Sequence, residues 1–290
     1  MKILEGKTLS ASVLAETKSA AKKFEEIKSR KPSLKIINYY DNSASSVYMN
    51  LKIKKAAEIG IDAVEIKPPE SGGKKEFLKI LKNLAGDSLT DAIMVERPLP
   101  PGFDDWEFWK NMPSDKDPDC LSADNNAKLY LSKTYAEIEK GSFFSPCTAL
   151  AAIKLAQYHG FSFSGKKAVV VGRSAVVGRP LAHMLTSLDA TVTLCHSKTS
   201  DLRYYLKNAD YIFLAIGKAK WLKKDMIGEN QVVIDIGTNF DENGKMCGDA
   251  DFEEIKQTAA AASPVPGGVG PVTLALLLKS SVTAAQKEGK

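Results

Sequence analysis

Tyr48 and Lys52 stand four residues apart in a segment whose pattern predicts a helix, SSVYMNLKIKKAAEIG. Side chains at this spacing share one helix face, about one turn apart. A lysine that is shielded from water gives up its proton more readily and can act in acid–base chemistry, while a tyrosine offers a flat ring and a hydroxyl donor. The same spacing is common on solvated helix faces, so the pair indicates a catalytic site only together with other features of the sequence.

Three carboxylates follow a predicted strand or lie in a turn where a ligand can approach them. Glu96 comes just past the strand AIMV, and Asp117 and Asp119 lie in the turn KDPDCL. Parallel sheets bind ligands beyond the carboxyl ends of their strands, which favours a role in binding or proton transfer. Turn capping and solvation are the alternative explanation, because aspartates are common in turns for local reasons.

A loop rich in glycine and proline, SPVPGGVGP, precedes the last predicted helix. Its prolines stiffen the backbone, and its glycines let another group approach closely. Such a loop can form a wall beside a flat ligand. A rigid entry to the helix is the alternative explanation.

A buried strand is predicted to end at Gly172 and a helix to begin near Gly178, within the run KAVVVGRSAVVGRPLAHML. Backbone N–H groups at the start of such a helix attract phosphate. Ser174 and Val177 stand where the second and third glycines of the dinucleotide fingerprint would be. The junction therefore fits either a dinucleotide site or an ordinary α/β turn, and the next strand supplies the context.

The end of that next strand bears on the choice of cofactor. In NAD sites an acidic residue there binds the ribose 2′-hydroxyl. Here the run TVTLCHSKT ends in Ser197, Lys198 and Thr199 without a carboxylate that would repel a 2′-phosphate. Arg173, Ser197 and Lys198 can bind that phosphate by charge and hydrogen bonds, which favours NADP over NAD. Ordinary surface charges are the alternative explanation for Arg173 and Lys198.

The order of predicted elements supplies a scaffold for these residues. Strands predicted at LKIINYY, DAVEIK and AIMVE, and later at KAVVV, TVTLC, YIFLAIG and QVVIDIG, alternate with helices. This order predicts parallel βαβ units, and apolar runs are typical of strands buried on both faces. We predict an α/β protein of two domains, each with a mainly parallel sheet flanked by helices, the second Rossmann-like. The segments RPLPPGFDDW and MPSDKDPDCLSADNN are expected to be loops.

The composition is that of an ordinary globular protein and excludes several classes. The chain has 290 residues, of which 44% are hydrophobic and 26% charged, and a formal net charge of +5, unlike a disordered tail, a fibrous repeat or a disulfide scaffold. Its 4 cysteines form no C-x-x-C pair and its 3 histidines show no ligand spacing, so we expect no metal site.

Unpaired thiols predict a cytoplasmic protein. The sequence has no signal peptide, no apolar run of membrane-spanning length and no dense basic stripe, so we expect no membrane or nucleic-acid partner.

Together these pieces resemble one family, the bifunctional methylenetetrahydrofolate dehydrogenase/methenyltetrahydrofolate cyclohydrolases. The resemblance runs from about Ser45 to Ala285, and its most specific pieces are S-x-x-Y-x-x-x-K, GRSxxVGRP, ATVTLCHSKT and SPVPGGVGP. It implies a substrate cleft between the two domains and, commonly, a homodimer. It also implies that residues 1–143 plus 272–290 form a folate-binding catalytic domain and residues 144–271 an NADP-binding domain, with the last helix packing back on the first.

The resemblance implies roles for individual residues. Lys52 is similar to the essential lysine of the cyclohydrolase step, Tyr48 to the aromatic residue that packs on folate, and Asp119 to the aspartate that binds the pterin. The positions similar to the family's cofactor-binding residues are Gly172, Arg173, Ser174, Ser197, Thr148 and Thr238. Pro266 and Gly270 belong to the loop that would line the cleft beside the substrate.

Four positions depart from the family pattern. Glu96 replaces the glutamine that assists the lysine, and a carboxylate beside Lys52 would favour its ammonium form and weaken it as a base. Pro118 and Cys120 replace a valine and a glycine of K-D-V-D-G, and Thr238 replaces an isoleucine near the cofactor.

The resemblance implies oxidation of 5,10-methylenetetrahydrofolate to the methenyl compound with NADP, then hydrolysis to 10-formyltetrahydrofolate. The change at Glu96 affects the second reaction more than substrate binding.

Other functions stay open at this point. A two-domain NADP oxidoreductase of the shikimate dehydrogenase type shares the architecture, but it gives no reason for Y-x-x-x-K and PVPGGVGP. A dehydrogenase-only or ligand-sensing homologue fits the change at Glu96, although the intact Lys52 argues against it.

Overall fold

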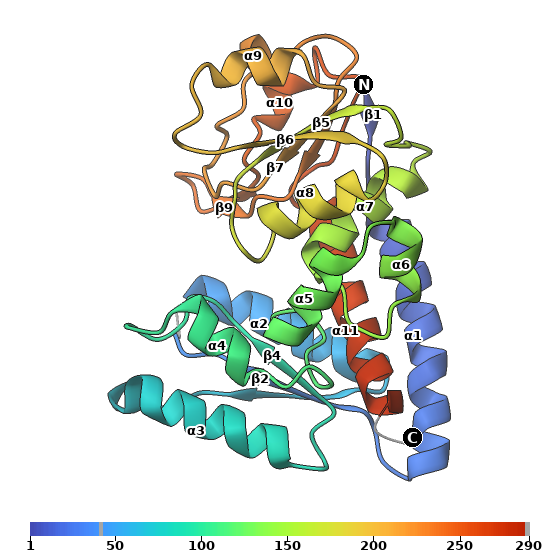
Figure 1. Cartoon of the computed structure of the whole chain (residues 1–290), viewed down its shortest axis with the longest axis vertical. Coiled ribbons are helices and arrows are strands. Elements are labelled where there is room, and N and C mark those ends of the chain that lie inside the picture. The colour runs from blue at the N-terminus through green and yellow to red at the C-terminus, as the bar shows by residue number, and fades with distance from the viewer. Residues whose placement is uncertain (41–42, 288–290) are drawn as a thin grey trace. The chain divides into compact units, whose positions relative to one another are not determined.

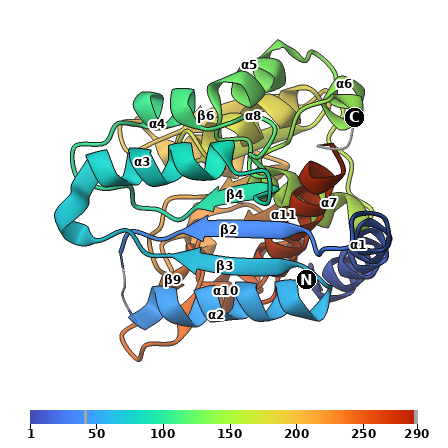
Figure 2. The ribbon, with the colours of Figure 1, turned by 90° about the horizontal axis from the view of Figure 1, so that it is seen from below.

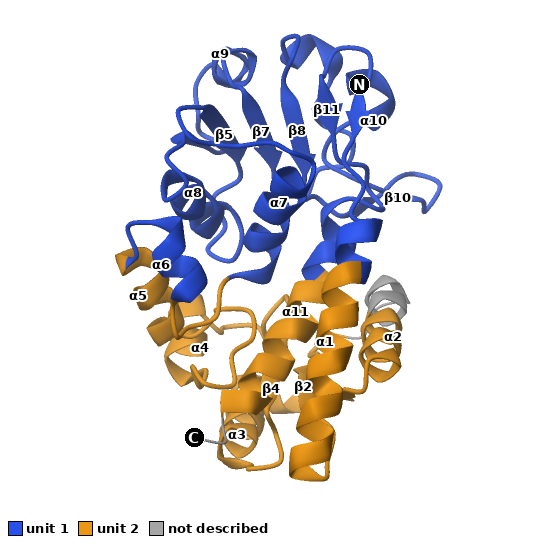
Figure 3. Ribbon diagram, turned by 90° about the vertical axis from the view of Figure 1, so that its right-hand side faces the viewer, with its two compact units in different colours: residues 1–11, 132–140, 146–273 blue, residues 12–131, 141–145, 274–290 orange. Residues whose placement is uncertain are grey.

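The computed structural model describes residues 1–40 and 43–287, apart from the side chains of residues 43–48 and 70. The chain divides into two compact units, which Figure 3 shows in different colours. Unit 1 comprises residues 1–11, 132–140 and 146–273, and unit 2 comprises residues 12–131, 141–145 and 274–290. Two long helices, α1 (Lys7–Lys28) and α11 (Val269–Lys287), contribute residues to both units.

A three-stranded parallel sheet forms the centre of unit 2. Its strands lie in the order β3 (Asp62–Ile66), β2 (Ser33–Ile37), β4 (Ala92–Val95), and Figure 2 shows β2 between its neighbours. The core joins Leu34 and Ile36 of β2 with apolar residues of α1, α2 and α11. Unit 2 also contains α2 (Ser43–Glu58), η1 (Glu70–Gly72), α3 (Gly73–Gly86), α4 (Asp105–Asn111) and α5 (Ala123–Leu131).

A six-stranded parallel sheet forms the centre of unit 1 (Figure 1). Its strands lie in the order β1 (Lys2–Ile3), β11 (Ala261–Ala262), β8 (Val232–Asp235), β7 (Tyr211–Leu214), β5 (Lys167–Val171), β6 (Thr191–Cys195). All residues of β7 and β8 are buried, as expected of strands covered on both faces. Because the strands are parallel, their carboxyl ends share one edge of the sheet.

Short helices and a hairpin complete unit 1. The helices are α6 (Tyr135–Lys140), α7 (Cys147–Tyr158), α8 (Gly178–Thr186), α9 (Leu202–Lys207), η2 (Lys224–Met226) and α10 (Phe252–Ile255). The strands β9 (Asn239–Phe240) and β10 (Met246–Cys247) pair antiparallel.

The α/β class with parallel sheets is confirmed, but two of the expected loops contain helices. The segment RPLPPGFDDW includes the start of α4, and MPSDKDPDCLSADNN includes the start of α5. Asp104 accepts a hydrogen bond from the backbone N–H of Glu107, and the Ser122 hydroxyl accepts one from that of Asn125. The residues that suggested turns are therefore helix caps, a role that turn formers share.

The N-terminal strand is the other difference. β1 pairs in parallel with β11, and Leu4 N–H donates to the carbonyl of Ala262 at 2.9 Å. Residues 1–11 therefore group with the six-stranded sheet of unit 1, whereas residues 274–290 group with unit 2. A two-residue strand has too few residues to show a period of two in the sequence.

Some negative findings hold for the described part of the chain. None of its helices has the length and apolar character that a bilayer span requires. Its histidine, cysteine and acidic side chains form no group of three or more that could hold a metal ion. The four cysteines are free and buried.

Candidate active site and cofactor site

Lys52 is a buried lysine on the sheet-facing side of α2. It lies three residues after Met49 and four before Ala56. Lys52 is 5% exposed, Met49 2% and Ala56 0%. This i, i+3, i+7 spacing forms the apolar stripe of an amphipathic helix. Packing of α2 against its unit therefore takes Lys52 out of water.

Glu96 pairs with Lys52. The Lys52 Nζ donates to Glu96 Oε1, and the two side chains are 6% and 20% exposed. The backbone N–H of Glu96 donates to the carbonyl of Ile37 at 2.9 Å and so extends the β2–β4 ladder by one residue. This bond holds Glu96 at the carboxyl edge of the three-stranded sheet, where parallel sheets bind ligands.

The surroundings of Lys52 act on its pKa in opposite directions. Burial lowers the pKa of Lys52 from 10.5 to about 8, and the negative charge of Asp119 opposes this decrease. The Glu96 carboxylate, which contacts the ammonium, also favours the protonated form. Lys52 is therefore a paired ammonium at neutral pH that can release its proton at mildly alkaline pH.

The loop that carries Asp119 is fixed by a second aspartate. Asp117 is fully buried and accepts hydrogen bonds from the backbone N–H groups of Leu121 and Ser122 and from the amide of Asn125, at 2.7–2.8 Å. Burial raises the pKa of Asp117, and these hydrogen bonds oppose the increase. Of the two carboxylates in KDPDCL, Asp117 thus holds the loop, whereas Asp119 is close enough to Lys52 to affect its charge.

The expected partner Tyr48 lies in α2, one turn before Lys52. Its side chain is outside the described residues, as is that of Ser45.

The turn of unit 1 that is expected to bind phosphate is packed very closely. Gly172 follows β5 with a φ of +119°, and a Cβ on it would lie 2.1 Å from the carbonyl oxygen of Ala215. A Cβ on Gly178 would lie 1.9 Å from the carbonyl oxygen of Gly172. The Ser174 hydroxyl accepts hydrogen bonds from the N–H groups of Val177 and Gly178, so two N–H groups expected to attract phosphate are capped by the protein itself. Both glycines are therefore required by the strand–turn–helix junction.

Gly172→Ala should lower the free energy of unfolding by about 3 kcal/mol, because it combines an unfavourable φ with overlap against a neighbouring strand. Gly165→Ala is the matched control, since Gly165 has a φ of +72° but open space around its Cβ position. Urea denaturation of both variants measures the difference. Equal losses would show that the close approach to Ala215 contributes nothing.

The residues expected to bind the 2′-phosphate follow the neighbouring strands β5 and β6. Val171 and Cys195 are paired in register, and Gly172 N–H donates to the Cys195 carbonyl at 2.9 Å. Arg173 and Ser197 each stand two residues beyond this pair and are exposed, as is Lys198. Neither Arg173 nor Lys198 forms an ion pair with a residue in the part of the chain that the structure describes, and an unneutralised cation suits a phosphate.

The other expected ligand positions also belong to unit 1. Thr238 follows β8 and Pro266 follows β11, so both lie at the carboxyl edge of the sheet. Gly270 and Thr148 are the second residues of α11 and α7. Thr238, Pro266 and Gly270 are exposed, and Thr148 is half-buried.

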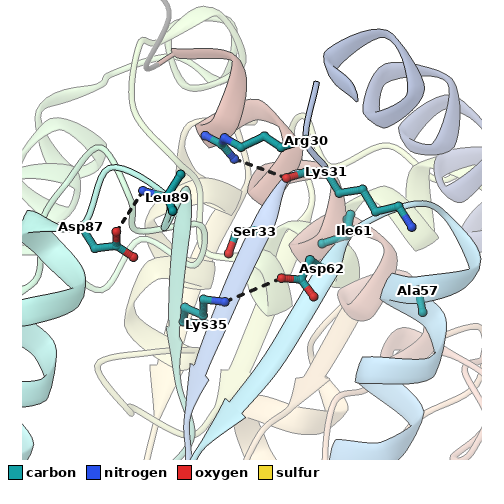
Figure 4. A pocket seen from close by; sticks show the side chains of 9 residues that line it. All are labelled: Arg30, Lys31, Ser33, Lys35, Ala57, Ile61, Asp62, Asp87 and Leu89. Atoms are coloured by element: carbon teal, nitrogen blue, oxygen red, sulfur yellow. Dashed lines mark hydrogen bonds and ion pairs between the residues drawn. The ribbon is translucent and has the colours of Figure 1, made fainter. Parts of the chain in front are cut away.

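Unit 2 also contains a pocket of about 700 Å³ at the amino end of its sheet (Figure 4). The Lys52–Glu96 pair lies at the opposite, carboxyl edge of this sheet. It is lined by Arg30, Lys31, Ser33, Lys35, Ala57, Ile61, Asp62, Asp87 and Leu89. Arg30 donates both arms of its guanidinium to the buried Asp91 at 2.6 and 2.7 Å, and Lys35 lies 3.8 Å from Asp62. Two of its three cations are thus already neutralised, and we assign no ligand to this pocket.

Sequence reasoning did not identify two buried aspartates of unit 1, Asp235 and Asp249. Each lies within two residues of a glycine, in DIG and GDA. A carboxylate so close to a glycine in an apolar setting is the signal that could have pointed to the two aspartates, although not to their hydrogen-bond donors.

Two models of one protein family match the chain. The catalytic domain of tetrahydrofolate dehydrogenase/cyclohydrolase matches residues 4–119. The NAD(P)-binding domain of the same family matches residues 146–289.

Individual proteins agree with this match. The bifunctional protein FolD of Elusimicrobium minutum is 42% identical over 99% of both chains. The crystal structure of FolD methylenetetrahydrofolate dehydrogenase/cyclohydrolase from Campylobacter jejuni is 37% identical, with a TM-score of 0.91 over 99% of both chains. Trypanosoma brucei FolD, solved in complex with NADP cofactor and inhibitor, is 30% identical, with a TM-score of 0.89 over 99% of this chain and 97% of that one.

A more distant structure shares only the fold. Shikimate dehydrogenase of Aquifex aeolicus is 13% identical, with a TM-score of 0.52 over 88% of this chain and 96% of that one.

Proposed function

The chain belongs to the tetrahydrofolate dehydrogenase/cyclohydrolase family, and from this we propose how its residues perform the two reactions. The enzyme oxidises 5,10-methylenetetrahydrofolate to 5,10-methenyltetrahydrofolate with NADP and hydrolyses the product to 10-formyltetrahydrofolate, as part of one-carbon metabolism. The observation that carries the assignment of roles is the buried Lys52–Glu96 pair at the carboxyl edge of a parallel sheet.

The proposed NADP site fits its ligand. The close turn at Gly172 lets the pyrophosphate approach the start of α8, where the Ser174 hydroxyl already occupies the N–H groups of Val177 and Gly178. Arg173, Ser197 and Lys198 supply charge and a hydroxyl for the 2′-phosphate. The end of β6 carries no carboxylate that would select NAD. When bound, NADP would supply the hydride acceptor for the oxidation, and the chain's contribution would be to hold the nicotinamide against the methylene carbon of the substrate. Ser174, Thr148 and Thr238 complete this site in our proposal.

Lys52 is the proposed acid–base group of the hydrolysis. In its neutral form it accepts a proton from the water that attacks the methenyl carbon, and in its charged form it returns a proton as the ring opens. Tyr48 packs on the folate, and Asp119 binds the pterin. Glu96 holds the ammonium form of Lys52, while Pro266 and Gly270 contact the substrate from their own loop.

Glu96→Gln should raise the rate of methenyltetrahydrofolate hydrolysis at pH 7 about fivefold. Burial already lowers the pKa of Lys52 to about 8. Removal of the adjacent carboxylate charge should lower this pKa further, so that a larger share of Lys52 is neutral at pH 7. The rate should therefore rise with pH in both proteins, with a lower midpoint in the variant. A pH–rate profile of the hydrolysis measures this.

Glu107→Gln is the control for Glu96→Gln, because Glu107 lies on α4 and pairs with Lys74 of α3 rather than with Lys52. A slower Glu96→Gln enzyme would show that the carboxylate is itself needed as a proton acceptor. A wild-type enzyme without hydrolysis, but with normal oxidation, would support the dehydrogenase-only alternative.

We also propose that the protein works as a homodimer in the cytoplasm. The dimer rests on the resemblance to the family. The four free, buried thiols support a reducing compartment.

A further inference from the structure

Asp235 and Asp249 are buried carboxylates of unit 1 to which the reaction assigns no role. They are 3% and 0% exposed. Asp235 ends β8, and Asp249 lies two residues after β10. A buried charge is costly unless hydrogen bonds compensate for it, so the donors around each carboxylate indicate what it does.

Within the described chain, the Asp249 carboxylate accepts hydrogen bonds from four donors in two loops. Three are backbone N–H groups of the loop after β7, and the fourth is the side-chain amide of Asn239, where the loop after β8 enters β9. They are Ile216 N–H at 2.7 Å, Gly217 N–H at 3.2 Å, Lys218 N–H at 2.7 Å and Asn239 Nδ2 at 2.9 Å. We call this set the Asp249 tie, because it fastens the loops after β7 and β8 to one side chain.

Asp235 fixes the backbone that carries this tie. Its Oδ1 accepts from the N–H groups of Gly237 at 2.9 Å and Asp249 at 3.1 Å, and its Oδ2 accepts from that of Ala250 at 2.7 Å. The oxygens of both aspartates thus face N–H donors, which disfavour a cation.

Two glycines make room for the carboxylates. A Cβ on Gly237 would lie 2.3 Å from Asp249 Cγ, and one on Gly248 would lie 2.0 Å from Asp235 Oδ2. The backbone therefore packs directly against both carboxylate groups, and the loops cannot shift without breaking these contacts.

The tied loops adjoin the positions expected to bind the cofactor. Thr238 lies between Gly237 and Asn239, which are held by Asp235 and Asp249 respectively. Gly172 packs against the carbonyl of Ala215, the residue directly before the tied Ile216. The Asp249 tie thus links the turn after β5, the loop after β7 and the loop after β8 at the ligand-binding edge of the sheet.

We propose that Asp249 is a positioning residue of the NADP site, which holds the loops after β7 and β8 in the shape that the nicotinamide half of the cofactor requires. This proposal rests on the proposed function. Asp249 does not touch the cofactor and acts through Thr238 and the segment Ile216–Lys218.

Asp249→Asn tests the proposal, because it keeps the shape of the side chain but turns an amide NH2 toward N–H donors. We expect the KM for NADP to rise about tenfold or more, as for the loss of a hydrogen bond to a charged group, with less than a twofold change in the KM for 5,10-methylenetetrahydrofolate. A purely structural residue would instead lower the melting temperature and the active fraction and leave the KM for NADP unchanged.

A second variant, Asn239→Ala, removes one donor of the tie at a half-buried position and tests the proposal even where Asp249→Asn does not fold. Its KM for NADP should rise about threefold or more. Asp251→Asn is the matched control, since Asp251 caps α10 and pairs with Lys223 rather than with either loop, and its KM for NADP should stay at the wild-type value. An unchanged KM for NADP in Asn239→Ala overturns the proposal. A wild-type enzyme that does not oxidise 5,10-methylenetetrahydrofolate with NADP overturns the proposed function instead.

Discussion

Replacing Lys52 with methionine should slow hydrolysis of methenyltetrahydrofolate about a thousandfold or more, while NADP binds as in the wild type. Methionine is apolar and of similar length, so it fills the space of the lysine beside Met49 and Ala56. It cannot accept or donate the protons of the reaction, and positioned acid–base groups contribute about 10²–10⁴ in rate. The decay of methenyltetrahydrofolate absorbance, corrected for the spontaneous rate, measures the effect.

Two further variants make this result specific. Lys52→Met leaves Glu96 without its cation, so the double variant Lys52→Met/Glu96→Gln separates loss of the base from the cost of an orphaned carboxylate. Lys55→Met is the control, because Lys55 lies on the same helix, has a side chain that is 38% exposed and pairs with Glu58. Normal hydrolysis by Lys52→Met would refute the role of this lysine.

The double variant Arg173→Ala/Ser197→Ala should weaken NADP binding about a hundredfold or more and NAD binding less than about threefold. The reason is that each residue would make a charge-assisted hydrogen bond to the 2′-phosphate, which NAD lacks, and such bonds contribute about 1.5–3 kcal/mol each. Calorimetric titration of each dinucleotide measures the two dissociation constants.

Arg203→Ala is the control for this pair, since Arg203 is an exposed arginine of the same unit that pairs with Asp225 on the surface. Equal losses for NADP and NAD in the double variant would show that Arg173 and Ser197 do not recognise the 2′-phosphate.

Much of the fold is predictable because the strands of both sheets are short, apolar and separated by helices. The runs KAVVV, YIFL and VVID are buried throughout or nearly so, and short β-branched apolar runs of this kind, bounded by turn residues, are recognisable in the sequence without any alternation. The two-residue strands β1 and β11 are not visible, because their pairing depends on the order of strands in the sheet rather than on local pattern. The helices α4 and α5 were missed because their capping residues, Asp104 and Ser122, are also turn formers.

The candidate site also has a part that the sequence predicts and a part that it does not. The spacing of Tyr48 and Lys52 predicts a shared helix face. The contact of Lys52 with Glu96, which is distant in sequence, depends on how α2 packs against the sheet. The Asp249 tie was beyond prediction for a stronger reason. Its donors are mostly backbone N–H groups. Nearly every residue type carries such a group, so these donors leave no pattern in the sequence.

The most direct test of the account is a crystal structure of the enzyme with NADP and a bound folate substrate analogue. We expect the amine of Lys52 within about 3 Å of the proton-exchanging atoms at the one-carbon unit, and the nicotinamide C4 about 3–3.5 Å from the reacting carbon. A structure in which the Lys52 amine points into bulk solvent, or in which the nicotinamide is remote from the one-carbon unit, would contradict it.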